Sequence, residues 1–98
     1  MWYMIAEGKT IGELGSENGC ILLDEEYKDR CSITLEKTEE YYAITCGVYG
    51  EFMHTTFAGE DDHLTKYNAM KHDLALFIDQ DIHYPASEQF YDEFSNRY

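Results

Sequence analysis

The fold is decided by the stretch Arg30-Cys31-Ser32-Ile33-Thr34-Leu35-Glu36, which precedes a short polar turn and the β-rich residues 41–49. Apolar and polar residues alternate in it at period two, as in a strand with one buried face. An even-numbered loop at residues 38–39 sets apolar residues of the two strands opposite one another. The expected pairs are Leu35 with Tyr42, Ile33 with Ile44, and Cys31 with Cys46. The sequence therefore predicts a β-hairpin with these side chains on one face.

Further strands are expected on both sides of this hairpin, at residues 2–6, 20–23 and 52–57. The run Asp24-Glu25-Glu26-Tyr27-Lys28-Asp29 is interpreted as a polar reversal, and residues 9–19 as a turn-rich segment without an assigned element. A four-residue turn at 49–52 adds three residues to the core face: Met53, Thr55 and Phe57. The opposite face then carries Thr34, Tyr41, Thr45, Tyr49, Phe52, His54 and Thr56. Either another segment covers that face or it is an aromatic contact surface.

A long helix is predicted over residues 59–80, because apolar residues recur there at helical spacing. The stripe consists of Leu64, Tyr67, Met70, Leu74, Phe77 and Ile78. A short helix over residues 85–94, with Phe90, Tyr91 and Phe94 on one side, follows it. The prediction is a single α+β domain over residues 1–98: an antiparallel β-meander of four to five strands packed by a long amphipathic helix, with a short C-terminal helix.

Acidic charge is the most unusual property of the sequence. Twenty Asp and Glu residues face seven Lys and Arg residues, a formal net charge of −13. Such a chain repels nucleic acids and anionic membranes and attracts basic proteins and cations. The alternative is that the acidity only keeps the protein in solution.

The expected location is the cytoplasm. Three cysteines are an odd number for a disulfide framework, the N-terminus has no positively charged region, and no window is apolar enough for a membrane span.

No motif assigns a catalytic residue, cofactor or metal. Gly8-Lys9-Thr10 lacks the earlier glycine of a phosphate-binding loop, and the run that begins at Asp79 lacks the glycine and final glutamate of a calcium loop. The chain is not expected to be an enzyme.

A partner-binding surface is predicted in the C-terminal part, where no Lys or Arg occurs between Lys71 and Arg97. Asp79 and Asp81 fall near the end of the long helix, where the helix dipole disfavours anions, which indicates a role in binding. Solvated acids beyond a frayed helix end are the alternative. The candidate partner-binding residues are Asp73, Asp79, Asp81, Tyr84, Glu88, Phe90, Tyr91, Asp92 and Glu93.

In size, charge and layout the chain resembles the small immunity proteins of bacterial toxin systems. The resemblance rests on a short acidic chain in which a meander with Asp24-Glu25-Glu26-Tyr27, residues 31–36 and Tyr42-Ala43-Ile44-Thr45-Cys46-Gly47 runs into an acidic helix. It implies a cytoplasmic protein that binds and blocks a basic toxin such as a nuclease. An interaction or regulatory domain with incidental acidity, and a small ligand-binding domain or enzyme, are the other classes that the sequence leaves open.

Overall fold

The predicted hairpin lies at the centre of the computed structural model, which describes all residues, 1–98. It consists of β3 (Cys31–Lys37) and β4 (Tyr42–Val48). Leu35 faces Ile44 and Ile33 faces Cys46, so the predicted register is wrong by two residues. Because two is an even number, the apolar side chains still share one face, and that part of the prediction is confirmed.

A longer loop causes this shift in register. Thr38 and Tyr41 close a four-residue loop, in which the Thr38 N–H donates to the Tyr41 carbonyl at 2.9 Å. The Thr38 hydroxyl oxygen also accepts a hydrogen bond from the Tyr41 N–H at 3.1 Å. A threonine side chain that bonds to nearby backbone in this way favours a turn over continued pairing.

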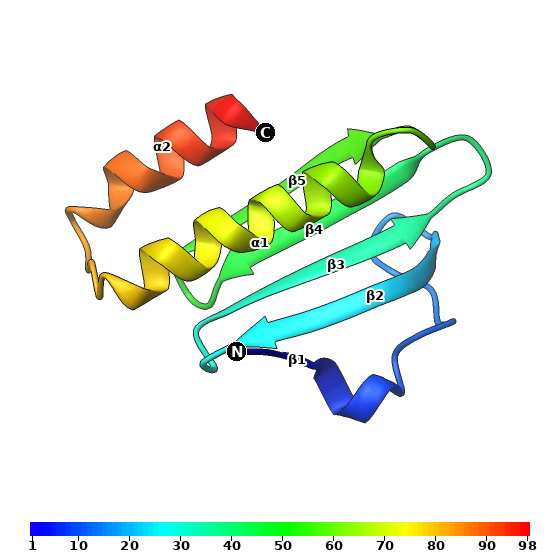
Figure 1. Ribbon diagram of the computed structural model, residues 1–98, viewed down its shortest axis with the longest axis horizontal. Helices are drawn as coiled ribbons and strands as arrows, with labels where there is room; N and C mark the ends of the chain where they lie inside the picture. Colours follow the sequence, from blue (N-terminus) through cyan, green and yellow to red (C-terminus); the bar gives the residue numbers. More distant parts are fainter.

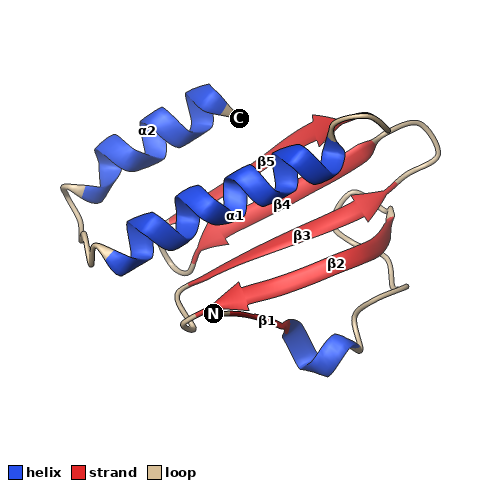
Figure 2. Ribbon diagram, viewed as in Figure 1, coloured by secondary structure: helices blue, strands red, loops and turns tan.

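The prediction of an α+β meander followed by a long and a short helix is confirmed (Figures 1 and 2). Five strands pair antiparallel in chain order, β1-β2-β3-β4-β5. The other elements are β1 (Trp2–Met4), the 3-10 turn η1 (Ile5–Gly8), β2 (Cys20–Tyr27), β5 (Phe52–Ala58), α1 (His63–Asp79) and α2 (Ser87–Arg97). No helix in the structure is both long and apolar enough to cross a membrane.

Strand β2 is longer than expected, and the interpretation of residues 24–29 as a reversal is wrong for the first four of them. Asp24, Glu25 and Glu26 pair with residues of β3 inside the sheet. Each carboxylate has a hydrogen-bond donor there; Asp24, for example, accepts from Thr34 at 2.8 Å. Acidic residues are poor strand formers in isolation, and tertiary partners override that preference here.

The side chains of β5 face the other way from the prediction. Val48 pairs with Phe52, so the connecting loop has three residues and includes Gly50 at a φ of +76°. An odd-numbered loop reverses the face of every residue that follows it. Met53, predicted in the core, is therefore 79% exposed, whereas Phe52 faces the helices.

Both helices cover the same face of the sheet, which we call the covered face. Helix α1 contacts β3, β4 and β5, and α2 lies beside it toward β5 (Figure 1). The predicted stripe of α1 is confirmed except for Leu64, which is half exposed. In α2, Tyr91 stacks on Phe52 with 4.5 Å between ring centroids, and the fully buried Phe94 packs beside it.

The three cysteines have free thiols. Cys31 and Cys46 lie buried on the covered face, and burial raises the pKa of each thiol to about 12. Both behave as small apolar residues of the core.

Candidate functional site: the open face of the sheet

The structure places the predicted partner-binding residues in three different settings. Three of the aspartates are already paired within the protein. Asp79 accepts hydrogen bonds from Lys28 at 2.8 Å and from Tyr27 at 2.9 Å, and these bonds lower the pKa of its carboxyl group. The unfavourable position of Asp79 at the helix end is thus offset by a cation, Lys28, from the turn between β2 and β3, so it does not indicate a role in binding.

Asp73 and Asp81 have basic neighbours as well. Asp73 accepts from Arg97 at 2.7 Å and from Tyr98 at 2.6 Å. Asp81 lies 3.7 Å from Arg30 and 2.9 Å from His83. The Lys and Arg partners of these aspartates come from outside the run between Lys71 and Arg97. The surface formed by that run therefore does contain basic side chains.

Two of the predicted aromatic anchors pack inside the protein. Tyr91 is 5% exposed, and Phe90 stacks on Phe77 with 4.1 Å between ring centroids. Burial and a hydrogen bond to Glu51 raise the pKa of Tyr91 to about 12. The remaining candidates are exposed: Tyr84, Glu88, Asp92 and Glu93. We call the three exposed acidic residues of α2, Glu88, Asp92 and Glu93, the α2 surface.

The second acidic region lies on the side of the sheet opposite the helices, which we call the open face. Strand pairing sets three rows of side chains across it. One row is Tyr3, Glu26, Ser32, Gly47 and Met53; the next is Asp24, Thr34, Thr45 and Thr55; the third is Ile21, Glu36, Ala43 and Phe57. In contrast to the covered face, the middle row contains only hydroxyl and carboxylate side chains.

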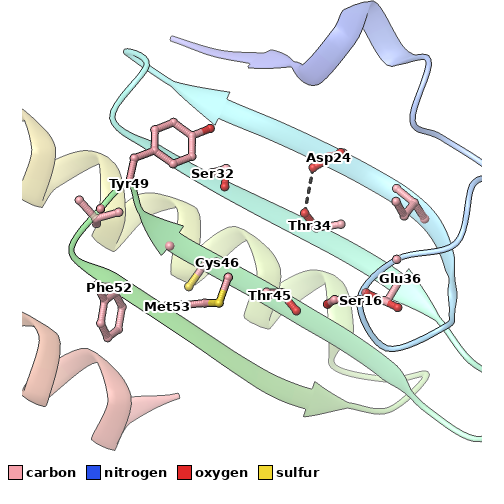
Figure 3. Close-up of a pocket in the computed structure, with 15 residues that line it drawn as sticks. Ser16, Asp24, Ser32, Thr34, Glu36, Thr45, Cys46, Tyr49, Phe52 and Met53 are labelled. Atoms are coloured by element: carbon pink, nitrogen blue, oxygen red, sulfur yellow. Dashed lines mark hydrogen bonds between the residues drawn. The ribbon is translucent and has the colours of Figure 1, made fainter.

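The open face is hollowed near its centre. The cavity has a volume of about 350 Å³, and we call it the acidic hollow (Figure 3). Its polar lining consists of Ser16, Asp24, Ser32, Thr34, Glu36, Thr45 and Tyr49. Gly47 has no side chain and its neighbour on β3 is the small Ser32, so the floor is low, while Tyr49, Met53 and the loop around Ser16 stand at its rim.

Glu36 is the most unusual residue of the acidic hollow. Its side chain is 0% exposed, although it belongs to the face that no helix covers. One carboxylate oxygen accepts hydrogen bonds from the backbone N–H groups of Glu17 at 3.0 Å and of Gly19 at 2.9 Å. The other oxygen is buried without a partner. Leaving a buried acceptor unsatisfied costs about 1–3 kcal/mol, so this arrangement is not the most stable one available to the position.

The loop over Glu36 depends on two glycines. A Cβ atom at Gly15 would lie 2.4 Å from the unpaired Glu36 oxygen, and one at Gly19 would lie 2.9 Å from the Lys37 carbonyl oxygen. Both positions therefore need the close backbone approach that only glycine allows. The loop is closed by the Gly15 N–H, which donates to the Gly19 carbonyl at 2.9 Å.

Glu26 is a third carboxylate on the open face and lies outside the hollow. Its carboxylate accepts hydrogen bonds from the Tyr3 and Tyr49 hydroxyls, and Tyr3 also contacts Asp29. Burial and the hydrogen bond to Glu26 raise the pKa of Tyr49 to about 12. These tyrosines hold the carboxylate in place but add no positive charge.

No Lys, Arg or His lines the acidic hollow. No group of three or more His, Cys, Asp or Glu side chains is arranged to hold a metal ion. The hollow thus presents hydrogen-bond acceptors with net negative charge, which suits a ligand that carries donors and positive charge.

Sequence reasoning missed Asp24, Glu26 and Glu36 as site residues. The first two were assigned to a turn because three acids in a row are typical of one. Glu36 belongs to the same alternating stretch as Ser32 and Thr34, so its place on the open face was predictable from period two. Its burial was not, because the covering loop lies 17 or more residues earlier in the chain.

The sequence predicted seven residues on the face opposite the core. The structure places them on both faces of the sheet. Phe52, His54 and Thr56 lie on the covered face, and Tyr41, Tyr49, Thr34 and Thr45 lie on the open face. Tyr41 and Phe57 pack edge to face there, with 5.1 Å between centroids, and both are partly exposed. The open face thus combines carboxylates with exposed aromatic rings.

Comparison of the chain with protein-family models, with curated proteins and with solved structures finds no significant match.

Proposed function

We propose that this chain is an acidic protein-binding module that binds and blocks a basic partner protein. The observation that supports it is the charge left after internal pairing. Of the twenty acidic residues, four pair with Lys or Arg within the protein, namely Glu25, Asp73, Asp79 and Asp81, which leaves sixteen without such a partner. A surface of this kind raises the rate of association with a basic protein.

Of the two acidic regions, the open face is the better candidate for the binding surface. It combines carboxylates that no cation neutralises with exposed aromatic and apolar side chains, such as Tyr49 at 48% and Met53 at 79%. Protein interfaces are enriched in Tyr, Phe and Met at their centres. The α2 surface has the charge but faces solvent on the polar side of an amphipathic helix, with Tyr91 and Phe94 turned toward the core.

The resemblance to immunity proteins suggests the class of the partner. We propose a basic toxin, such as a nuclease, whose nucleic-acid site an acidic surface would occupy in place of phosphate groups. Binding of this kind takes place in the cytoplasm, where such a toxin acts.

The test is to isolate binding partners from the native cell with the full chain as bait, and to measure association kinetics for the purified pair. We expect a basic protein whose association slows steeply with salt, because the Debye length falls from about 10 Å at 0.1 M to about 3 Å at 1 M. Enzymatic activity of that partner should be lost in the complex. Association that is insensitive to salt, or the absence of any basic partner, would contradict the proposal and favour an interaction domain with incidental acidity.

A small ligand-binding domain is the second candidate, and the acidic hollow is the observation that favours it. Pockets of about 300–1,000 Å³ with converging polar groups are typical of small-molecule sites, and the hollow is at the lower end of that range. A search that finds no basic partner protein, together with a small cationic metabolite that binds the hollow, would support this candidate over the first.

A further inference from the structure

We infer that the acidic hollow receives an arginine side chain of the basic partner, and this inference rests on the proposed function. The hollow would be the point at which the interface is anchored. Buried pockets that accept an Arg, Trp or Tyr side chain account for most of the binding energy in many interfaces.

Charge is the first argument. Asp24 is 8% exposed and Glu36 is 0% exposed, yet no basic side chain lies at the hollow to neutralise either of them. The partly buried Glu25, on the other face of β2, differs: it accepts from Lys71 at 2.9 Å and from Tyr67 at 2.7 Å. The hollow is thus the place where the fold buries carboxylates and leaves out the cation.

Hydrogen-bonding capacity is the second argument. One oxygen of Glu36 is buried without a donor, and Thr34 supplies one donor to Asp24 at 2.8 Å. The hydroxyls of Ser32, one row away on β3, and of Thr45, across from Thr34 on β4, also line the hollow and are able to accept further bonds (Figure 3). A ligand with several N–H donors would bond to the Asp24 carboxylate and to these hydroxyls, and the negative charge of Glu36, which lies beneath the loop, would attract a cation to the same place.

Shape favours arginine over lysine. The guanidinium is planar and presents five donors in a fixed fork, whereas the lysine ammonium is a compact point charge. The Tyr49 ring stands at the rim of the hollow, where the flat face of a guanidinium stacks favourably on an aromatic ring (Figure 3). The exposed Met53 side chain lies on the same rim and suits the apolar stem of an arginine.

The experiment is an NMR titration of the full chain with N-acetyl-L-arginine amide, with the uncharged N-acetyl-L-citrulline amide as the matched probe. We expect saturable shifts of the amide signals of Gly15, Thr34 and Gly47 with the arginine derivative and much weaker ones with citrulline. Glu36→Gln and Asp24→Asn should each weaken binding about tenfold or more, since each removes a poorly solvated negative charge from the hollow. Glu93→Gln, on the α2 surface, is the control and should leave the affinity unchanged.

Gln at position 36 is able to accept the same two backbone hydrogen bonds, so the loop should stay closed, and Asp24→Asn tests the site independently of that loop. Equal binding of citrulline, shifts confined to the α2 surface, full affinity of both hollow variants, or no saturable shifts would each overturn the inference. The proposed function fails in a different way, through the absence of a basic partner. If a basic partner binds the chain but the arginine derivative does not bind the hollow, only the inference about the hollow is overturned.

Discussion

The covered and open faces of the sheet differ in burial and in polarity. On β3, Ile33 and Leu35 are at most 1% exposed beneath the helices, whereas Ser32 and Thr34, their neighbours in sequence, line the acidic hollow. The covered face is filled by aliphatic and aromatic side chains, as a close-packed core requires. The open face has hydroxyls, carboxylates and a low floor. Adjacent residues of one strand thus serve stability on one side and, in our proposal, binding on the other.

Glu36 marks the point at which this division is incomplete. It belongs to the open face by its position on β3 but is as buried as any core residue, because the loop around residues 15–19 folds over it. The contrast suggests that variants of the two faces should separate stability from binding, and that the loop should affect both.

The largest expected effect is loss of stability from the covered face. Leu74 is 0% exposed, so Leu74→Ala should lower the free energy of unfolding by about 2–5 kcal/mol. Met53→Ala, on the open face at 79% exposure, should change it by no more than about 0.5 kcal/mol. Urea denaturation of both variants measures the difference. A loss below about 1 kcal/mol for Leu74→Ala would show that the helix does not pack as described.

A smaller loss is expected at the loop over Glu36. Gly15→Ala introduces a Cβ atom 2.4 Å from the Glu36 carboxylate and should cost about 1–3 kcal/mol. Gly59→Ala is the matched control, because its nearest neighbour would lie 3.7 Å away and its φ is not positive. Equal stability of the two variants would mean that the loop is free to lift away from Glu36.

The smallest effect concerns the ion pair at the end of α1. Asp79→Asn should lower stability at neutral pH, not raise it, because Lys28 and Tyr27 hold the pKa of Asp79 below its ordinary value of 3.8. A lowered pKa in the folded state contributes stability that is present above the unfolded pKa and is lost as the pH falls through the folded value. The difference between wild type and variant should therefore shrink as the pH falls below 3.8 and disappear only below the lower pKa of the folded state. A variant that is more stable than wild type at pH 7 would mean that repulsion among the acids outweighs this pair.

Local patterns predicted much of the covered face. Period two in residues 31–36 and helical spacing from Tyr67 to Ile78 identified core residues correctly, because each pattern reflects one buried side. Loop lengths limited the prediction of which side chains face the core. Three residues instead of four after Val48 reversed every side chain of β5, and no residue type at 49–52 decides between the two lengths.

The acidic sites were harder to predict, since their environment comes from distant segments. Asp79 is paired by Lys28, 51 residues earlier in the chain, and Glu36 is covered by a loop at residues 15–19. A run of acids shows where the charge lies in the sequence, but only the fold shows which carboxylates have found a cation. For this reason our proposal places the binding surface on the open face and not on the C-terminal residues that the sequence predicted.

The most direct test of the proposed division compares the two acidic surfaces in binding to the isolated partner. Asp24→Asn with Glu26→Gln alters the open face, and Glu88→Gln with Glu93→Gln alters the α2 surface; each pair removes two negative charges. Surface plasmon resonance should show affinity reduced about tenfold or more for the open-face pair, since two carboxylates without a cation partner are lost from the proposed interface, and only a small change for the α2 pair. Both variants should unfold at the same urea concentration within experimental error. Equal losses from the two pairs, or a larger loss from the α2 pair, would contradict the assignment of binding to the open face.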